Sequence, residues 1–328
     1  MTIPAFLSVD VEPDAFQLSR RDPQGWEGYR ATLEVVERLR AALSARSDAR
    51  PRFGWYFRTD PQIAEVYGQP DHVLTAFPDR VARLQASGDY FGVHAHAIRW
   101  SEDHQLWVHD FGDASWHAHA TRFALDGYAR WAGAPARRFR SGAGFLTNGI
   151  VDVIDRCGIT VDLTLEPVSG WGLTASTVTA GADSSPIIGA YTDCHTAPRV
   201  PYRPARRDFR VRARRSGRDV VMIPLATTTP ARPQPAWKRT VKWLLGRRPQ
   251  AQVLYPDAGW ASGSSYWDVV ERQLSSMPRP YLSIAIRTDR PDSAGAPAVR
   301  RIFEALPQHR LAARLCFTDP LEVVDRLV

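Results

Sequence analysis

Residues 6–14 read FLSVDVEPD, a short apolar run that ends in three carboxylates. This composition predicts a buried β-strand that opens into a polar loop. Side chains at i and i+2 of an extended chain point to the same side. Asp10 and Glu12 are therefore expected to face one way, so that one can bind a metal ion while the other accepts a proton. For this triplet alone, a solvated acidic turn is the default interpretation.

Helical and strand-like patterns alternate along the rest of the chain. Apolar residues at three-to-four spacing indicate helices, and short β-prone runs indicate strands. The predicted helices cover 27–46, 78–87, 115–132, 148–157, 266–276, 297–306 and 320–327, and the predicted strands cover 6–9, 53–57, 90–94, 138–140, 160–163, 220–223, 281–286 and 314–317. This order predicts an α/β protein, a barrel or a doubly wound sheet, whose parallel strands end at one common edge.

Two histidines, His94 and His96, stand at the end of a predicted strand with the same i, i+2 spacing. Neutral imidazole is a ligand for zinc, iron, cobalt and nickel. Core or hydrogen-bonded histidines would explain an isolated His-x-His pattern equally well. Together with Asp10 and Glu12 on a neighbouring strand, however, the pair predicts a metal site with open positions. Such a site polarises a carbonyl and generates hydroxide near neutral pH.

Three stretches resemble, in order and spacing, the motifs of the polysaccharide deacetylases (NodB-homology, carbohydrate esterase family 4). Residues 8–12, SVDVE, are similar to the acidic first motif, residues 92–96, GVHAH, to the histidine motif, and residues 139–145, FRSGAGF, to the arginine motif. The clear match covers about residues 5–165, and residues 281–328 match loosely. The resemblance implies a deformed (β/α)7 barrel.

The same resemblance implies the domain organisation and the roles of several residues. A single barrel domain would span 1–328, with an irregular, Arg-rich insertion at 165–265. Asp10 would be the general base, and Glu12 and His94 would be metal ligands. Arg140 would keep Asp10 ionised, because a nearby cation favours the carboxylate. The implied cofactor is a divalent metal, with zinc expected first and nickel, cobalt or iron as alternatives.

The sequence departs from the family pattern at two places. The family usually spaces its histidine ligands at i and i+4, but position 98 is Ile98, so His96 has to replace the second ligand. The family's proton donor is usually a histidine on a late strand, whereas strand 281–286 leads into Arg287, Thr288 and Asp289. The candidates for proton donation are therefore His195, His109 and Asp289.

Four further residues are predicted to bind the substrate. Arg58 and Asp60 end the strand at 53–57, and Asp60 is also a candidate to complete the metal sphere. Trp100 and His109 follow the histidine motif, where they are expected to cover the site.

The charge of the chain is unevenly distributed. The formal net charge is +7, yet residues 199–248 carry 15 basic and 2 acidic side chains, which leaves the rest of the chain net negative. Local basicity argues against a nucleic-acid-coating protein and favours one segment that faces a polyanion or a membrane. Residues 237–245 predict a short amphipathic helix that rests on an anionic membrane surface. A solvated, Arg-rich excursion is the simpler alternative.

The N-terminal residues lack a signal-peptide pattern, and the three cysteines are widely spaced. With no apolar stretch of about 18 residues either, the chain is expected in the cytoplasm, including the inner membrane surface.

The resemblance, together with the predicted metal site, implies a metal-dependent hydrolase that removes an acetyl group from a sugar of a polysaccharide or glycan precursor. One alternative is a barrel with altered or lost catalysis, either a metal-independent C–N hydrolase or a glycan-binding protein. The other is a membrane- or polyanion-binding protein that acts through residues 199–248. Binding of nucleic acid is not expected.

Overall fold

The motif-bearing strand β1 (Ile3–Val11) lies inside a parallel sheet and has hydrogen-bonded neighbours on both sides. The computed structural model describes residues 2–21, 25–46, 50–168, 174–175, 186–228, 251–258, 260–289 and 297–328. Within these residues the strand order is β10-β7-β6-β3-β2-β1-β13, all parallel, and β14 pairs with the start of β1. The other strands of this sheet are β2 (Gly54–Arg58), β3 (Tyr90–Ala95), β6 (Arg138–Ser141), β7 (Val161–Asp162), β10 (Val221–Met222), β13 (Leu282–Arg287) and β14 (Leu315–Phe317).

The sheet curls into a barrel whose two edges meet through irregular backbone. The N–H of Ala226, which follows β10, donates to the carbonyl of Ser283 in β13 at 2.8 Å. The Tyr281 hydroxyl donates to the Pro224 carbonyl at 3.0 Å across the same gap. The expected deformed (β/α)7 barrel is thereby confirmed.

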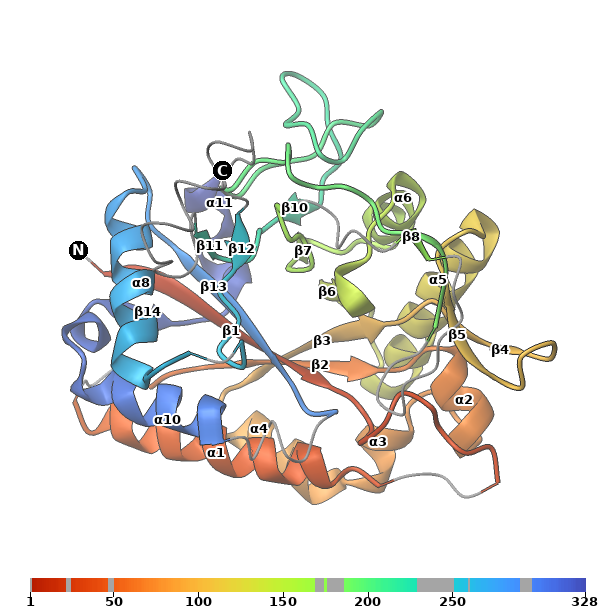
Figure 1. The fold of residues 1–328 in the computed structure, drawn as a ribbon, viewed down its shortest axis with the longest axis horizontal. Helices are drawn as coiled ribbons and strands as arrows, with labels where there is room; N and C mark the ends of the chain where they lie inside the picture. Colours follow the sequence, from red (N-terminus) through yellow and green to blue (C-terminus); the bar gives the residue numbers. More distant parts are fainter. Residues whose placement is uncertain are drawn as a thin grey trace, which may run out of the picture.

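Helices cover the outside of the barrel, and α1 and α10 lie side by side along one face (Figure 1). The helices are α1 (Glu27–Ser44), α2 (Pro61–Tyr67), α3 (His72–Ala76), α4 (Pro78–Ala86), α5 (Ala114–Ala132), α6 (Asn148–Arg156), α8 (Gly263–Ser275), α10 (Pro297–Ala305) and α11 (Val324–Leu327). Short 3-10 turns span Gly142–Gly144, Leu306–Gln308, Arg310–Ala313 and Pro320–Glu322. No helix in the described part of the chain is both long enough and apolar enough to cross a membrane.

Alternation along β1 separates two hydrophobic cores. Leu7 and Val9 belong to the core between the sheet and the helices, whereas Phe6 belongs to a smaller core inside the barrel. Successive side chains of a strand point to opposite faces. Asp10 shares its parity with Phe6, so its side chain enters the barrel mouth. Glu12 continues the same parity just beyond the strand.

Each predicted strand overlaps an observed strand, and each predicted helix that falls on described residues overlaps observed helical turns. The sequence did not predict the hairpin of β4 (Ile98–Ser101) and β5 (Leu106–Asp110), which pairs with β9 (Ile187–Ala190) and, through it, β8 (Thr174–Ala175). Its turn contains Gln105 at φ 50°, a conformation that Gly or Asn normally signals. A further two-stranded pair joins β11 (Thr227–Thr228) to β12 (Gln252–Val253). The predicted helix at 237–245 lies outside the described residues.

Candidate metal and hydrolytic site

The strand register brings the predicted site residues to one end of the barrel. Asp10 of β1 stands beside Arg287 of β13. Arg58 of β2 stands beside His94 of β3, which in turn stands beside Arg140 of β6. Because all of these strands are parallel, their carboxyl ends form one polar mouth, as in other α/β barrels.

Glu12, His94 and His96 form a buried group, here named the ligand triad. The two Nε2 atoms lie 3.0 Å apart, Glu12 Oε1 lies 3.4 Å from His94 Nε2, and Glu12 Oε2 lies 3.2 Å from His96 Nε2. Ligand atoms about 2 Å from one tetrahedral zinc ion lie roughly 3.3 Å from each other. Glu12 Oε1 is buried and has no hydrogen-bond partner within the described structure. These donors and their spacing fit a single divalent ion.

The protonation states of the triad also suit metal binding. Burial raises the pKa of Glu12, but interactions with the neighbouring His96 and His94 outweigh this effect and hold the pKa well below its usual value. Burial and the charge of Arg58 hold the pKa of His96 well below its usual value. An ionised carboxylate and a neutral imidazole are the forms that bind metal.

Neighbouring groups orient the two imidazoles differently. His94 Nδ1 lies 3.2 Å from the carbonyl oxygen of Arg140, so a proton on Nδ1 leaves the Nε2 lone pair facing the triad. His96 Nδ1 is buried without a hydrogen-bond partner in the described residues. Its ring is positioned by packing instead, because a Cβ atom on Gly142 would lie only 2.2 Å from it.

Asp10 is held by Arg140 through two parallel hydrogen bonds. Arg140 Nε donates to Asp10 Oδ1 at 2.7 Å, and Nη2 donates to Oδ2 at 3.0 Å. Arg140 also donates to the Leu163 carbonyl, which ties the guanidinium to β7. Both side chains are buried, so this bidentate pair keeps a carboxylate beside the triad. His94 Nδ1 lies 3.7 Å from Asp10 Oδ1.

Arg58 and Asp60 form a second buried ion pair next to the triad. Asp60 accepts hydrogen bonds from Arg58 Nε and, at 2.9 Å, from Nη2. Asp60 also accepts the backbone N–H of His96 at 3.2 Å. Arg58 Nη1 lies 3.4 Å from Glu12 Oε2. Asp60 therefore orients Arg58 and the histidine loop, and it lies outside the group of atoms that converge as ligands.

Of the two predicted residues on the β4–β5 hairpin, His109 packs against the triad, whereas Trp100 packs against Trp107. The buried His109 ring lies 5.3 Å from the His96 ring, and both rings contact Phe16. Burial and the charge of Arg58 lower the pKa of His109 to about 3, so its imidazole is neutral at pH 7. Trp100 is half-buried and packs on Trp107, with the guanidinium of Arg20 5.0 Å from its ring centre.

The remaining predicted residues differ in how close they come to the mouth. Asp289 is buried after the end of β13, with Arg287 Nε at 3.4 Å. The His195 side chain is 56% exposed and pairs with Asp193 at 2.7 Å. Within the described residues His195 forms no hydrogen bond or ion pair with Asp10 or the triad. The structure thus brings Asp10, Arg58, Asp60 and Arg140 into contact with the triad. Trp100 and His195 form no hydrogen bond or ion pair with this group in the described part of the chain.

Sequence reasoning missed two residues of the mouth, Glu166 and Tyr255. Glu166 follows β7 and is buried, and the Tyr255 hydroxyl donates to its Oε1. The rule that polar residues follow strand ends would have selected Glu166, which lies three residues after the predicted strand at 160–163. Tyr255 carries no such signal, because it lies in the irregular region.

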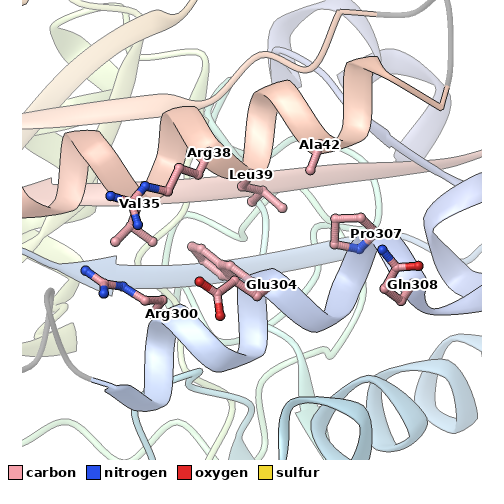
Figure 2. A pocket seen from close by; sticks show the side chains of 9 residues that line it. Val35, Arg38, Leu39, Ala42, Arg300, Glu304, Pro307 and Gln308 are labelled. Carbon is pink, nitrogen blue, oxygen red and sulfur yellow. The ribbon is translucent and has the colours of Figure 1, made fainter.

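A surface pocket of about 220 Å³ lies elsewhere, between α1 and α10 (Figure 2). Its walls include Val35, Leu39 and Pro307, and it contains none of the predicted site residues. The chemistry-bearing side chains therefore gather at the strand ends and not in this pocket.

No protein-family model and no curated protein sequence matches the chain. Solved structures do match. A candidate polysaccharide deacetylase from Mycobacterium smegmatis has a TM-score of 0.52 and 12% identity, covering 99% of this chain and 90% of that one. The PuuE allantoinase has a TM-score of 0.52 and 13% identity, covering 98% and 89%. A candidate glycoside hydrolase or deacetylase from Parabacteroides distasonis has a TM-score of 0.54 and 13% identity, covering 96% and 69%. The chain therefore has the polysaccharide deacetylase fold, as its motifs predicted.

Proposed function

We propose that this chain is a metal-dependent hydrolase that removes an acetyl group from a sugar of a polysaccharide or glycan precursor. One observation carries the proposal: the ligand triad converges beside the Asp10–Arg140 ion pair at the mouth of the barrel. A metal site next to an ionised carboxylate combines a Lewis acid with a general base. The fold shared with a candidate polysaccharide deacetylase supports the choice of reaction.

The residues of the mouth would have different roles in this reaction. A divalent ion bound by Glu12, His94 and His96, zinc in the first instance, would polarise the acetyl carbonyl and lower the pKa of water. Asp10 accepts the proton of the attacking water, and Arg140 holds both oxygens of Asp10 in place through its two hydrogen bonds. The products are acetate and the free amine or hydroxyl of the sugar.

A nucleotide- or lipid-linked sugar is the substrate class that we propose. Such a precursor carries phosphate, and residues 199–218 present exposed arginines that suit it, namely Arg206, Arg207, Arg214 and Arg215.

A second candidate is hydrolysis of a different carbon–nitrogen bond without metal. Arg58 Nη1 at 3.4 Å already gives Glu12 a cationic partner, and β13 ends in Asp289 where the deacetylase pattern has a histidine. Metal content separates the two candidates, because only the first requires an ion in the triad.

The test begins with elemental analysis of protein purified without chelator and then incubated with Zn²⁺. We expect about one ion per chain in the wild type and in His119→Ala, a control at an exposed histidine. Glu12→Gln and His94→Ala should lose the ion, because each removes one of three ligands. A wild type that takes up no metal would contradict the proposal.

The loaded enzyme is then assayed on acetylated sugars. Asp10→Asn should keep its metal and lose activity by a factor of about 10²–10⁴, the usual contribution of a general base. Asp126→Asn changes an exposed carboxylate of α5 and serves as the control. Full activity in Asp10→Asn would exclude Asp10 as the base.

A further inference from the structure

An acetamide needs a proton donor that the predicted residues do not supply. Breaking its C–N bond expels a nitrogen that must be protonated as it leaves. Asp10 serves as the base, since Arg140 binds both of its oxygens. Within the described residues His195 pairs with Asp193 and with no group of the mouth, and the buried His109 ring packs against Phe16 and the His96 ring. Asp289 faces Arg287.

Glu166 carries a buried carboxyl group to which the proposed function assigns no role. Glu166 is only 8% exposed, and the Tyr255 hydroxyl donates a hydrogen bond to its Oε1. No hydrogen bond to Oε2 is formed among the residues that the structure describes, which leaves the second oxygen of the carboxyl group for the role proposed below. A Cβ atom on Gly144 would lie 2.5 Å from Oε1, so the glycine makes room for the carboxyl group beside the arginine motif.

Burial, and not the neighbouring charges, favours the protonated form of Glu166. Burial raises the pKa of Glu166, and this effect outweighs the hydrogen bond from Tyr255 and the charges of Arg140 and Arg287. The groups that interact with it electrostatically are Tyr255, Arg140, Arg287, Asp10, Tyr191 and Cys194.

Glu166 and Asp10 stand on different sides of the mouth. In the strand order, β7 and β1 are separated by β6, β3 and β2. The guanidinium of Arg140 binds Asp10 directly and also lies close enough to Glu166 to interact with it electrostatically. A substrate carbonyl near the triad can therefore meet the base on one side and Glu166 on the other. This arrangement lets one group take the proton of water while a separate group protonates the leaving nitrogen.

We propose that Glu166 is the catalytic acid that protonates the leaving nitrogen, an inference that rests on the proposed function. When the C–N bond breaks, its electron pair goes to nitrogen, which takes the proton from Glu166 Oε2. Asp10 has meanwhile taken one proton from water. That proton returns to Glu166 through solvent, so each cycle consumes one water and yields one acetate and one amine.

The test compares two chromogenic substrates with the same acetyl group and the same ring in Zn²⁺-loaded protein. 4-Nitrophenyl acetate expels a phenolate that needs no proton at pH 7, whereas 4-nitroacetanilide expels an amine that does. Glu166→Gln should lower kcat/KM for the anilide by a factor of at least about 100 and for the ester by less than about threefold.

The other outcomes overturn the assignment in distinguishable ways. Equal losses on both substrates would indicate a structural role for Glu166, and unchanged rates on both would remove it from the reaction. If the wild type cleaves only the ester, the enzyme expels no amine. This result would overturn the role of Glu166 as the catalytic acid, while the protein would still be an esterase. A metal-loaded wild type inactive on both substrates and on acetylated sugars overturns the proposed function itself.

The pH dependence of kcat/KM in Tyr255→Phe separates an acid from a residue with only a structural role. The hydrogen bond from Tyr255 lowers the pKa of Glu166, so its removal should raise that pKa. The alkaline fall of kcat/KM for the anilide should therefore move to higher pH. Tyr128→Phe removes a hydroxyl from a ring of α5 that packs on Trp131, keeps the Tyr255 hydrogen bond and should leave the profile in place. An unshifted profile in Tyr255→Phe would contradict the assignment of the acid.

Discussion

At the scale of single residues, Gly142 controls the position of a triad imidazole. A methyl group there would lie 2.2–2.3 Å from ring atoms of His96, so Gly142→Ala must displace the ring. We expect loss of the bound ion and a cost of about 1–3 kcal/mol in the free energy of unfolding of the metal-free protein. Elemental analysis and urea denaturation measure the two effects.

The matched control is Gly149→Ala in α6. Its new Cβ would meet only Thr147 Oγ1, at an ordinary 3.6 Å, so metal content and stability should stay close to wild type. If Gly142→Ala retained a full complement of metal, the ring would not be positioned by this contact.

Asp162 gives a residue-scale prediction about pH. Burial raises its pKa from 3.8 to about 6, although Thr164 donates two hydrogen bonds to the carboxylate. The folded state thus holds the proton more tightly than the unfolded state. The resulting stability is complete below pH 4 and is lost as the pH rises through 6, by up to about 3 kcal/mol.

Asp162→Asn carries no ionisable group and should escape this loss. The free energy of unfolding of the variant minus that of the wild type should rise between pH 4 and 6 and stay constant above pH 7. Urea denaturation across this range measures the difference. The exposed Asp126→Asn should show no such rise, and a flat difference for Asp162→Asn would mean that the carboxyl group is already ionised at pH 4.

At the scale of elements, the end of β13 orients the loop after β1. Thr288 Oγ1 accepts the backbone N–H of Glu12 at 2.7 Å and donates to the Glu12 carbonyl at 2.8 Å. Thr288→Val keeps the shape but leaves both backbone groups without a partner, at a cost of about 1–3 kcal/mol. Zn²⁺ affinity should fall by a factor of about 10–100, because Glu12 loses its support. Calorimetric titration with Zn²⁺ and urea denaturation test both effects.

Ser283→Ala is the control on the same strand. The Ser283 hydroxyl is buried and has no hydrogen-bond partner in the described residues, so its removal should not lower the stability. Wild-type Zn²⁺ affinity in Thr288→Val would show that β13 does not position the ligand.

At the scale of the whole molecule, an ion pair ties the barrel together at the end opposite the mouth. Arg138, at the start of β6, donates to both carboxylate oxygens of Asp319, which follows β14 and lies 181 residues later. Both side chains are mostly buried. Asp319→Ala leaves the guanidinium without its partner, so we expect a loss of about 3 kcal/mol in the free energy of unfolding.

Replacing both partners should restore most of this loss. Arg138→Met combined with Asp319→Leu removes the unpaired charge and fills the space with apolar atoms. Thermal and urea denaturation of the single and double variants measure the coupling. Asp325→Ala, an exposed position of α11, should behave as wild type. Stability unchanged in Asp319→Ala would show that the pair does not hold the two segments together.

Local patterns were sufficient to predict the order of helices and strands and much of the mouth. Apolar periodicity reports which face of an element is buried, and parallel strands bring their polar ends to one edge. Asp10, Glu12, His94 and His96 could be selected in this way, since each stands at or just beyond a strand end, whereas Arg140 was implied by the resemblance of residues 139–145 to the arginine motif. The β4–β5 hairpin escaped prediction because its turn lacks Gly or Asn.

The pairing of the polar groups depended on closure of the barrel, which no local pattern reports. Asp60 was a candidate ligand, yet its carboxylate binds Arg58 and the backbone N–H of His96, so its oxygens do not converge with the ligand atoms of the triad. Tyr255 reaches Glu166 across 89 residues of sequence. Buried charges take whichever partners the packed chain brings within hydrogen-bond distance, since an unpaired charge is costly in a low-dielectric interior. Positions at strand ends therefore predicted which residues lie at the mouth. The packing of distant segments determined which of these residues form hydrogen bonds and ion pairs with each other.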